Sequence, residues 1–225
     1  MCLILNIDSS METASVCLSK NGEMKAMLKN PAQKEHAAWL HVAIRQLMEM
    51  EQLTFADLQA IAITEGPGSY TGLRVSMSAA KGLCYALQIP LVTESTLLVM
   101  TLAATTEASI PDDVLFCPMI DARRMEVFTA IYNRKMEAIV LPKALILEKN
   151  SFDDILPWHK ICFFGNGSIK WKNFHSHTNS FFSDISANAE WLGKLSFRKF
   201  LNHEFTDIIY SHPAYIKEFH SHNKK

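Results

Sequence analysis

A corner of the chain at residues 65–74 constrains the fold more than any other segment. It reads EGPGSYTGLR, with a strand-like apolar run at residues 60–64 before it and a long helical pattern after it. Glycine supplies positive φ and close backbone approach, and Ser69 or Thr71 can cap the free amides of the new helix. The corner has three interpretations: a phosphate cradle, a nucleophile elbow, or a device that directs one helix at a neighbour.

The phosphate cradle is tested first, because a helix N-terminus preceded by glycines attracts anions. Gly66, Gly68 and Gly72 give G-x-G-x-x-x-G, which is one residue longer than the dinucleotide fingerprint. The Gly-Lys-Ser/Thr ending of a P-loop is missing, and Pro67 removes one amide donor. Residues 68–72 do not fit the G-x-S-x-G of a nucleophile elbow. The sequence therefore favours a tight, capped helix start, and a nucleotide cradle remains the alternative.

The composition is that of an ordinary soluble globular protein. The chain has 225 residues, 48% of them hydrophobic and 20% charged, and its formal net charge is −1. Such a chain is not a polyanion binder as a whole, so a tRNA would need another subunit or a local basic patch. Two stretches offer such a patch, although a solvated helix face is the favoured interpretation of both: Lys170-Trp171-Lys172, and Lys194 with Arg198 and Lys199.

The cysteines and the hydropathy pattern point to the cytoplasm. The five cysteines are scattered in apolar runs without a C-x-x-C motif, which predicts buried, reduced thiols with neither zinc nor disulfides. No apolar run approaches the roughly 18 residues of a membrane span, so we expect no membrane association.

The order of predicted elements indicates an α/β fold of two related halves. Strands are expected at residues 3–7, 14–19, 60–64, 91–93, 114–120, 126–132, 137–147 and 160–164, and helices at 33–52, 69–87, 95–108 and 187–201, with a short helix from Ser151. Lys20-Asn21-Gly22 is a hairpin signal that predicts a third, antiparallel strand directly after it. We therefore predict subdomains at residues 1–109 and 110–225, with a C-terminal tail able to pack back on the first.

Three segments resemble the TsaB family. They are LNIDSS at residues 5–10, the glycine corner continuing to AAKGL at 79–83, and IDAR at 120–123. The Gly165-Asn166-Gly167 stretch and the tail Pro213-Ala214-Tyr215 fit more loosely. The resemblance implies an actin-like (ASKHA, ribonuclease H-like) duplicated fold, with two subdomains that each contain a mixed sheet flanked by helices.

The resemblance also implies a function. TsaB is the non-catalytic dimerisation subunit of the bacterial machinery that transfers threonylcarbamoyl to N6 of the adenosine 3′ of the tRNA anticodon. The implied partners are a catalytic TsaD-like subunit and a TsaE-like ATPase, with tRNA contacted indirectly through the complex, and a homodimer is possible when the partner is absent. We expect no cofactor in this subunit, and expect ATP and metal in the partner subunits.

The residues expected at the nucleotide cleft look degenerate. The first hairpin turn, Asp8-Ser9-Ser10-Met11-Glu12, has no glycine, and Glu12 would repel phosphate. Asp8 could orient a hydrated metal, but hydrogen bonds from these side chains within the turn are favoured. We assign nine residues to a degenerate phosphate loop and cleft: Asp8, Ser9, Ser10, Gly66, Gly68, Ser69, Thr71, Asp121 and Arg123. A turn-stabilising Asp121–Arg123 pair is favoured over a contact with a ligand.

No metal site is expected. TsaD-like subunits resemble metalloenzymes with a H-x-x-x-H pair, whose spacing puts both imidazoles on one helix face. His36 and His41 are five residues apart, which separates them by about 140° around a helix. No base, nucleophile or metal supports catalysis, so an active actin-like ATPase or kinase and a metal-dependent hydrolase remain only as alternatives.

Two helices are expected to bind the partner. The helix from Ser69 carries two apolar rows on nearly opposite sides, so one row packs on its own sheet and the other needs a second cover. In the preceding helix, Trp39 and Val42 fall outside the main apolar stripe, and Trp is enriched at interface hot spots. We predict a partner interface formed by Trp39, Val42, Leu73, Arg74, Met77, Ala80, Lys81 and Cys84. Cover of the second row by the neighbouring helix of the same chain is the alternative.

Overall fold

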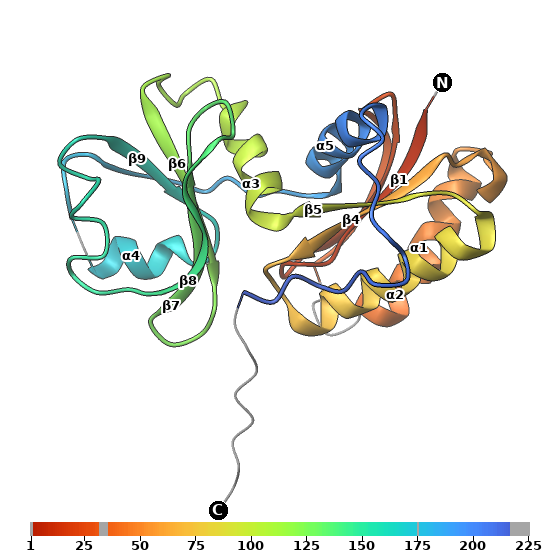
Figure 1. The fold of residues 1–225 in the computed structure, drawn as a ribbon, viewed down its shortest axis with the longest axis horizontal. Coiled ribbons are helices and arrows are strands. Elements are labelled where there is room, and N and C mark those ends of the chain that lie inside the picture. The colour runs from red at the N-terminus through yellow and green to blue at the C-terminus, as the bar shows by residue number, and fades with distance from the viewer. Residues whose placement is uncertain (1, 32–35, 175, 217–225) are drawn as a thin grey trace, which may run out of the picture.

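Two five-stranded sheets lie side by side in the computed structural model, which describes residues 2–31, 36–174 and 176–216 (Figure 1). The first sheet has the order β3 (Glu23–Asn30), β2 (Ala14–Lys20), β1 (Leu3–Asp8), β4 (Ala60–Gly66) and β5 (Leu91–Ser95). The second has the order β10 (Ser180–Ser183), β9 (Lys160–Phe164), β6 (Val114–Asp121), β7 (Glu126–Tyr132) and β8 (Ala138–Ile146).

The two sheets share one topology. Counted from its own first strand, each sheet has the order 3-2-1-4-5. In each, the first three strands form an antiparallel meander, the fourth is parallel to the first, and the fifth is parallel to the fourth. This repeat confirms the predicted actin-like duplicated fold.

The side chains of β1 alternate between two helical layers. Leu3, Leu5 and Ile7 pack in one core with α1 (His36–Met50) and α2 (Tyr70–Leu87). Ile4 faces the opposite side, in a core shared with α3 (Thr96–Thr105) and α5 (Ala189–Leu201). Both faces of the first sheet are therefore covered, which is why all six residues of β1 are buried.

Helix α5 crosses back from the second half to the first sheet (Figure 1). Buried hydrogen bonds centred on Asn6 lie at this contact. Ser196 Oγ donates to Asn6 Oδ1 at 2.7 Å, and Asn6 Nδ2 donates to Ser19 Oγ at 2.8 Å. Gly193 allows this approach, since a Cβ there would lie 3.1 Å from that of Ser19. The C-terminal part of the chain thus belongs to the core of the first sheet.

The second half departs from the prediction in three places. Residues 149–158 form hydrogen-bonded turns instead of a helix, and the short elements α4 (Ser168–Phe174) and β10 were not predicted. These elements are short and depend on long-range packing: Trp171 of α4 is fully buried and meets Phe152 edge-on at 4.9 Å.

In the first half, residues 33–35 of the helix predicted from Gln33 lie outside the described residues. A 3-10 turn at Phe55–Asp57 follows this helix.

Candidate functional site

The turn after β1 is organised by its own carboxylate. Asp8 Oδ1 accepts hydrogen bonds from Ser10 N at 3.0 Å, Ser10 Oγ at 2.6 Å and Thr64 Oγ1 at 2.8 Å. The side chain of Asp8 is 2% exposed, so these donors replace the water that a buried carboxylate would otherwise require. In the structure, Asp8 therefore holds the turn and the end of β4 together.

The glycine corner packs directly against this turn. Ser69 N donates to the carbonyl of Ser10 at 2.7 Å, and Ser9 Oγ donates to the carbonyl of Gly72 at 2.7 Å. A Cβ on Gly68 would overlap the carbonyl oxygen of Ser10, and one on Gly72 would overlap that of Ser9. The glycines are thus needed for the close approach of two backbones rather than for a ligand.

The N-terminus of α2 is closed by the same contacts. Ser69 is its N-cap and accepts from Gly72 N at 3.3 Å, while Thr71 is exposed on the first turn. Gly66 has φ 122° and would meet the carbonyl of Ala214 at 2.8 Å if it carried a Cβ. The chain's own carbonyl oxygens and the Ser69 hydroxyl therefore pack closely around the start of α2.

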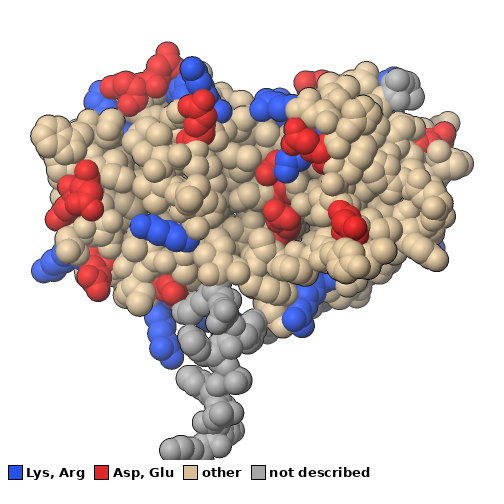
Figure 2. Space-filling view, viewed as in Figure 1, with Lys and Arg blue, Asp and Glu red and all other residues tan. Residues whose placement is uncertain are grey.

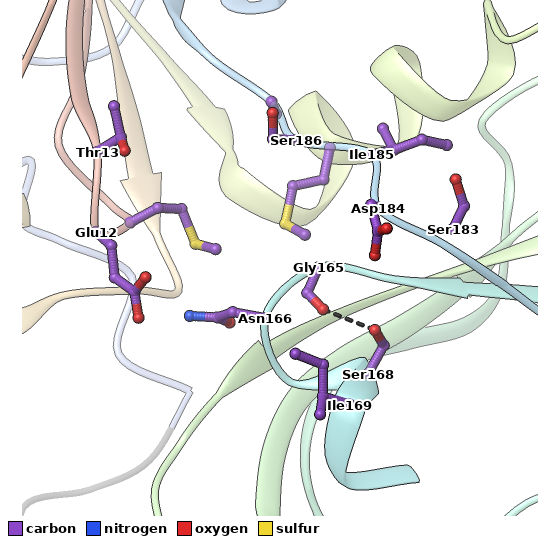
Figure 3. Close-up of a pocket in the computed structure, with 13 residues that line it drawn as sticks. Glu12, Thr13, Gly165, Asn166, Ser168, Ile169, Ser183, Asp184, Ile185 and Ser186 are labelled. Atoms are coloured by element: carbon purple, nitrogen blue, oxygen red, sulfur yellow. Dashed lines mark hydrogen bonds between the residues drawn. The ribbon is translucent and has the colours of Figure 1, made fainter. Parts of the chain in front are cut away.

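A cavity of about 270 Å³ lies between the two halves, next to the closed corner (Figure 3). Glu12 from the β1–β2 turn and Asn166 from the loop after β9 reach into it from opposite sides, and Asp184 lines it from the segment after β10. Among the described residues that line the cavity, none is Lys or Arg. Two carboxylates without a cation repel phosphate, so these residues do not fit a nucleoside triphosphate.

The turn between β6 and β7 is centred on Asp121. Its Oδ1 accepts from the backbone N of Arg123 at 2.6 Å and from Lys170 Nζ at 2.6 Å, and Asn166 Oδ1 accepts from Asp121 N at 2.9 Å. Partial burial raises the pKa of Asp121, but the hydrogen bonds from Lys170 and from the Arg123 amide outweigh it and hold the pKa below its usual value. The predicted side-chain pair is replaced by a bond to the Arg123 backbone and an ion pair with Lys170.

The structure corrects which face of α2 points outward. Four of the residues that we predicted for the partner interface are between 0% and 4% exposed and lie in the protein interior: Leu73, Met77, Ala80 and Cys84. Trp39 of α1 is half-buried against the same core. All five side chains therefore pack in the first half, and the four buried ones on α2 are not available to a second chain. Of the predicted set, Val42 is 53% exposed and remains on the outer surface.

The outward face of α1 and α2 combines small residues with exposed apolar ones. On α2, Ser78, Gly82 and Ala86 are exposed, and a Cβ added to Gly82 would meet nothing within 4 Å. Around them are the large apolar side chains that the two helices expose: Val42 at 53%, Met50 at 56%, Tyr70 at 36% and Tyr85 at 71%. We call this set of seven residues the outer helix face.

Arg74 and Lys81, also predicted for the interface, hold the C-terminal segment of the same chain. Arg74 Nε donates to the hydroxyl of Tyr215 at 2.9 Å, and its guanidinium lies 4.0 Å above the ring of Tyr70. Lys81 Nζ donates to the carbonyls of Ile209 and Ser211 at 3.3 and 3.0 Å. Residues 209–215 therefore run along α2 beside the outer helix face. A C-terminal tail able to pack back on the first half was predicted, but its contacts with α2 were not, because the segment lacks hydrophobic periodicity.

Within residues 2–31, 36–174 and 176–216, no group of three or more His, Cys, Asp and Glu side chains could hold a metal ion. No helix in the described part of the chain is long and apolar enough to cross a lipid bilayer.

Fold and site together define a class: an actin-like α/β protein whose phosphate loop is closed by its own side chains. Comparison with known proteins then identifies the family. The family model described as TsaD, tRNA N6-adenosine threonylcarbamoyltransferase, matches residues 29–156. A TsaB protein of Buchnera aphidicola is 30% identical over 155 residues, which cover 65% of this chain and 68% of the relative. The chain belongs to the TsaB family.

Other relatives agree. A TsaB protein of Bacillus subtilis is 35% identical over 132 residues, or 59% of this chain and 56% of the relative, so this match spans little more than half of that protein. A solved structure from Pseudomonas aeruginosa, described as an uncharacterised protein with similarity to peptidase YeaZ, superposes with a TM-score of 0.84. It is 24% identical and covers 96% of this chain and 100% of that one, which supports the same fold over nearly the whole chain.

Proposed function

We propose that this chain is the non-catalytic, cytoplasmic accessory subunit of a complex that transfers threonylcarbamoyl to N6 of the adenosine 3′ of the tRNA anticodon. Its relatives are named tRNA threonylcarbamoyladenosine biosynthesis proteins, and the family model carries the name of the transferase. Catalysis, ATP and metal then belong to a TsaD-like subunit and a TsaE-like ATPase, and this chain needs no cofactor.

The observation that carries the proposal is the closed phosphate loop. In a working actin-like ATPase, the turn after the first strand would bind phosphate through its backbone. Here the Asp8 carboxylate accepts three hydrogen bonds from its own chain, and the Ser10 carbonyl is bonded to the N-terminus of α2. A nucleotide would have to break these buried bonds, and each buried group left unpaired costs about 1–3 kcal/mol.

The outer helix face supports the partner assignment. Small residues let the backbones of two helices approach closely, and exposed aromatic side chains are common interface anchors. The face presents Ser78, Gly82 and Ala86 in one row, with Tyr85 71% exposed beside them. We propose that helices of the TsaD-like subunit pack here, and that two copies of this chain pair through the same face when that subunit is absent.

Reconstitution tests the proposal. Supplied with a labelled, activated threonylcarbamoyl donor, purified TsaD-like and TsaE-like proteins of the same organism should modify unmodified tRNA at full rate only when this chain is added. Full activity without it would disprove the accessory role.

The alternative is an active actin-like ATPase or kinase, or a metal-dependent hydrolase. Titration calorimetry of the isolated chain with Mg-ATP separates these functions, because micromolar binding would require an open phosphate site. Elemental analysis of the pure protein addresses the hydrolase, which would need a bound metal.

A further inference from the structure

We propose that Arg123 and Arg124, at the tip of the β6–β7 hairpin, bind phosphate groups of the tRNA backbone. This inference rests on the proposed function, since it takes tRNA to be the substrate of the complex. It assigns to this chain a direct RNA contact in addition to its contact with the partner subunit. The hairpin tip lies at the lower edge of the second sheet in Figure 1.

The backbone of the hairpin tip contradicts the local preference of its sequence. Arg123 has φ 71° and Arg124 has φ 48°. The left-handed region costs about 1–2 kcal/mol for a residue with a Cβ, and turns of this kind usually contain Gly or Asn. Two successive arginines are therefore a poor choice for the turn itself. Positions where a sequence breaks its local rule are commonly functional.

The tip is braced from several sides. Glu126 N donates to the carbonyl of Arg123 at 3.0 Å, and Leu147 N donates to that of Met125 at 2.7 Å. Asp121 accepts from the backbone N of Arg123 at 2.6 Å. The two arginine side chains thus project from a rigid backbone. This reduces the entropy that is lost when the hairpin tip binds a ligand.

The charge of the two guanidinium groups is available. Lys170 of α4 forms an ion pair with Asp121 at 2.6 Å, so the charges of these two residues offset each other. Both arginines are exposed, and among the described residues no ion pair or hydrogen bond involves either guanidinium. Guanidinium binds phosphate with two parallel hydrogen bonds, which a neutral turn residue cannot provide.

The basic stretches singled out in the sequence are largely occupied by intramolecular contacts. Lys199 pairs with buried Glu94 at 3.1 Å, and the ammonium groups of Lys172 and Lys194 lie 5.8 and 5.0 Å from the rings of Phe182 and Trp191. On the face shown in Figure 2, Lys and Arg are scattered among Asp and Glu rather than gathered in one patch. A chain of net charge −1 therefore needs a local phosphate contact, and the hairpin tip provides it.

The test replaces both arginines with residues that prefer positive φ. The Arg123→Asn/Arg124→Gly chain should unfold at the same temperature as the wild type or higher, because the turn is no longer strained. In the reconstituted complex, the affinity for an unmodified tRNA transcript should fall, and the slope of log K against log salt should decrease by about 1–2. Lys20→Asn/Lys29→Asn is the matched control, since it removes two exposed positive charges from β2 and β3 of the first sheet and should leave the slope unchanged.

A second variant guards against a structural explanation. Arg123→Gln/Arg124→Gln keeps side chains of similar length in the same strained turn, and it should lose the same tRNA affinity. An intact complex with unchanged tRNA affinity and salt slope in both double variants overturns this inference and leaves the proposed function standing. Failure of the wild-type chain to bind the TsaD-like subunit would instead overturn the proposed function. Titration with ATP separates a free nucleotide from RNA: a loss of ATP binding alone also overturns the inference.

Discussion

Gly82 offers a direct test of the outer helix face, because a substitution there should affect the free chain and the complex in opposite directions. It lies inside α2, where glycine is less favourable than alanine by about 0.8–1.0 kcal/mol. In the structure the position is exposed, and an added Cβ would meet nothing within 4 Å. Gly82→Ala and Gly82→Arg should therefore each stabilise the free chain by about 0.7–1 kcal/mol, because arginine is nearly as good a helix former as alanine.

For a chain of this length, that gain corresponds to a rise in Tm of about 2–4 °C. Differential scanning calorimetry of the wild type and both variants measures it. Binding to the TsaD-like subunit, followed by co-elution in size-exclusion chromatography, should respond differently. A charged, bulky arginine in the middle of a helix–helix contact prevents close packing and should abolish the complex, whereas alanine should weaken it only slightly.

Asn173→Arg is the matched control, because it adds the same side chain to an exposed position of α4 in the second half. It should leave the complex intact. A fall in Tm for Gly82→Ala would contradict the open surface around this residue. Full co-elution of Gly82→Arg with the TsaD-like subunit would refute the outer helix face as the docking surface.

Three further predictions concern the interior and the second hairpin. Leu73→Asp and Met77→Asp should unfold the chain, as circular dichroism would detect, because both side chains are at most 4% exposed and a buried unpaired carboxylate is strongly unfavourable; a folded variant that lost only its partner would contradict this. Because the pKa of Asp121 is lowered in the folded state, its ion pair with Lys170 adds stability above the ordinary Asp pKa of about 3.9, and that stability disappears as the pH falls through the lower folded-state value. Asp121→Asn should therefore unfold in urea more easily than the wild type at pH 7, and this difference should shrink as the pH falls below the ordinary Asp pKa. A pH-independent difference would count against the ion pair. Burial raises the pKa of Cys17, Cys84 and Cys117 to about 12. Ellman's reagent should therefore leave these thiols unmodified at pH 8 until the chain is denatured. Rapid labelling of the native protein would show instead that the thiols are accessible.

The first half of the fold could be predicted from its sequence because its signals are local. The strand at residues 3–7 and the corner at 65–74 are read from alternation, apolar runs and glycine spacing, and the structure has β1 and the start of α2 there. The C-terminal segment could not be predicted in this way. Its contacts with α2, such as the bond from Arg74 to Tyr215, join residues 141 positions apart and leave no periodic trace.

The orientation of α2 shows a different limit of sequence reasoning. One of its apolar rows has larger side chains and the other mainly small ones, but periodicity alone does not decide which row packs on the sheet. Packing decides it: Met77 and Cys84 fill the core beside β1, and the row with Gly82 and Ala86 stays outside. The existence of a face for a second chain could be inferred from the sequence, but the residues that form it required the structure.

The turn after β1 and the position of the outer helix face depend on the same set of contacts, those between Ser9 and Ser10 and the glycine corner. Ser9 and Ser10 pack so closely against the glycine corner that no side chain would fit at Gly68 or Gly72. The same contacts fix the residue at which α2 begins. A loop that opened to admit phosphate would have to move away from the N-terminus of α2, and the helix would lose its anchor on the first sheet. Under the proposed function, the contacts that fill the glycine corner are therefore also those that fix the start of α2, the helix proposed to dock on the partner.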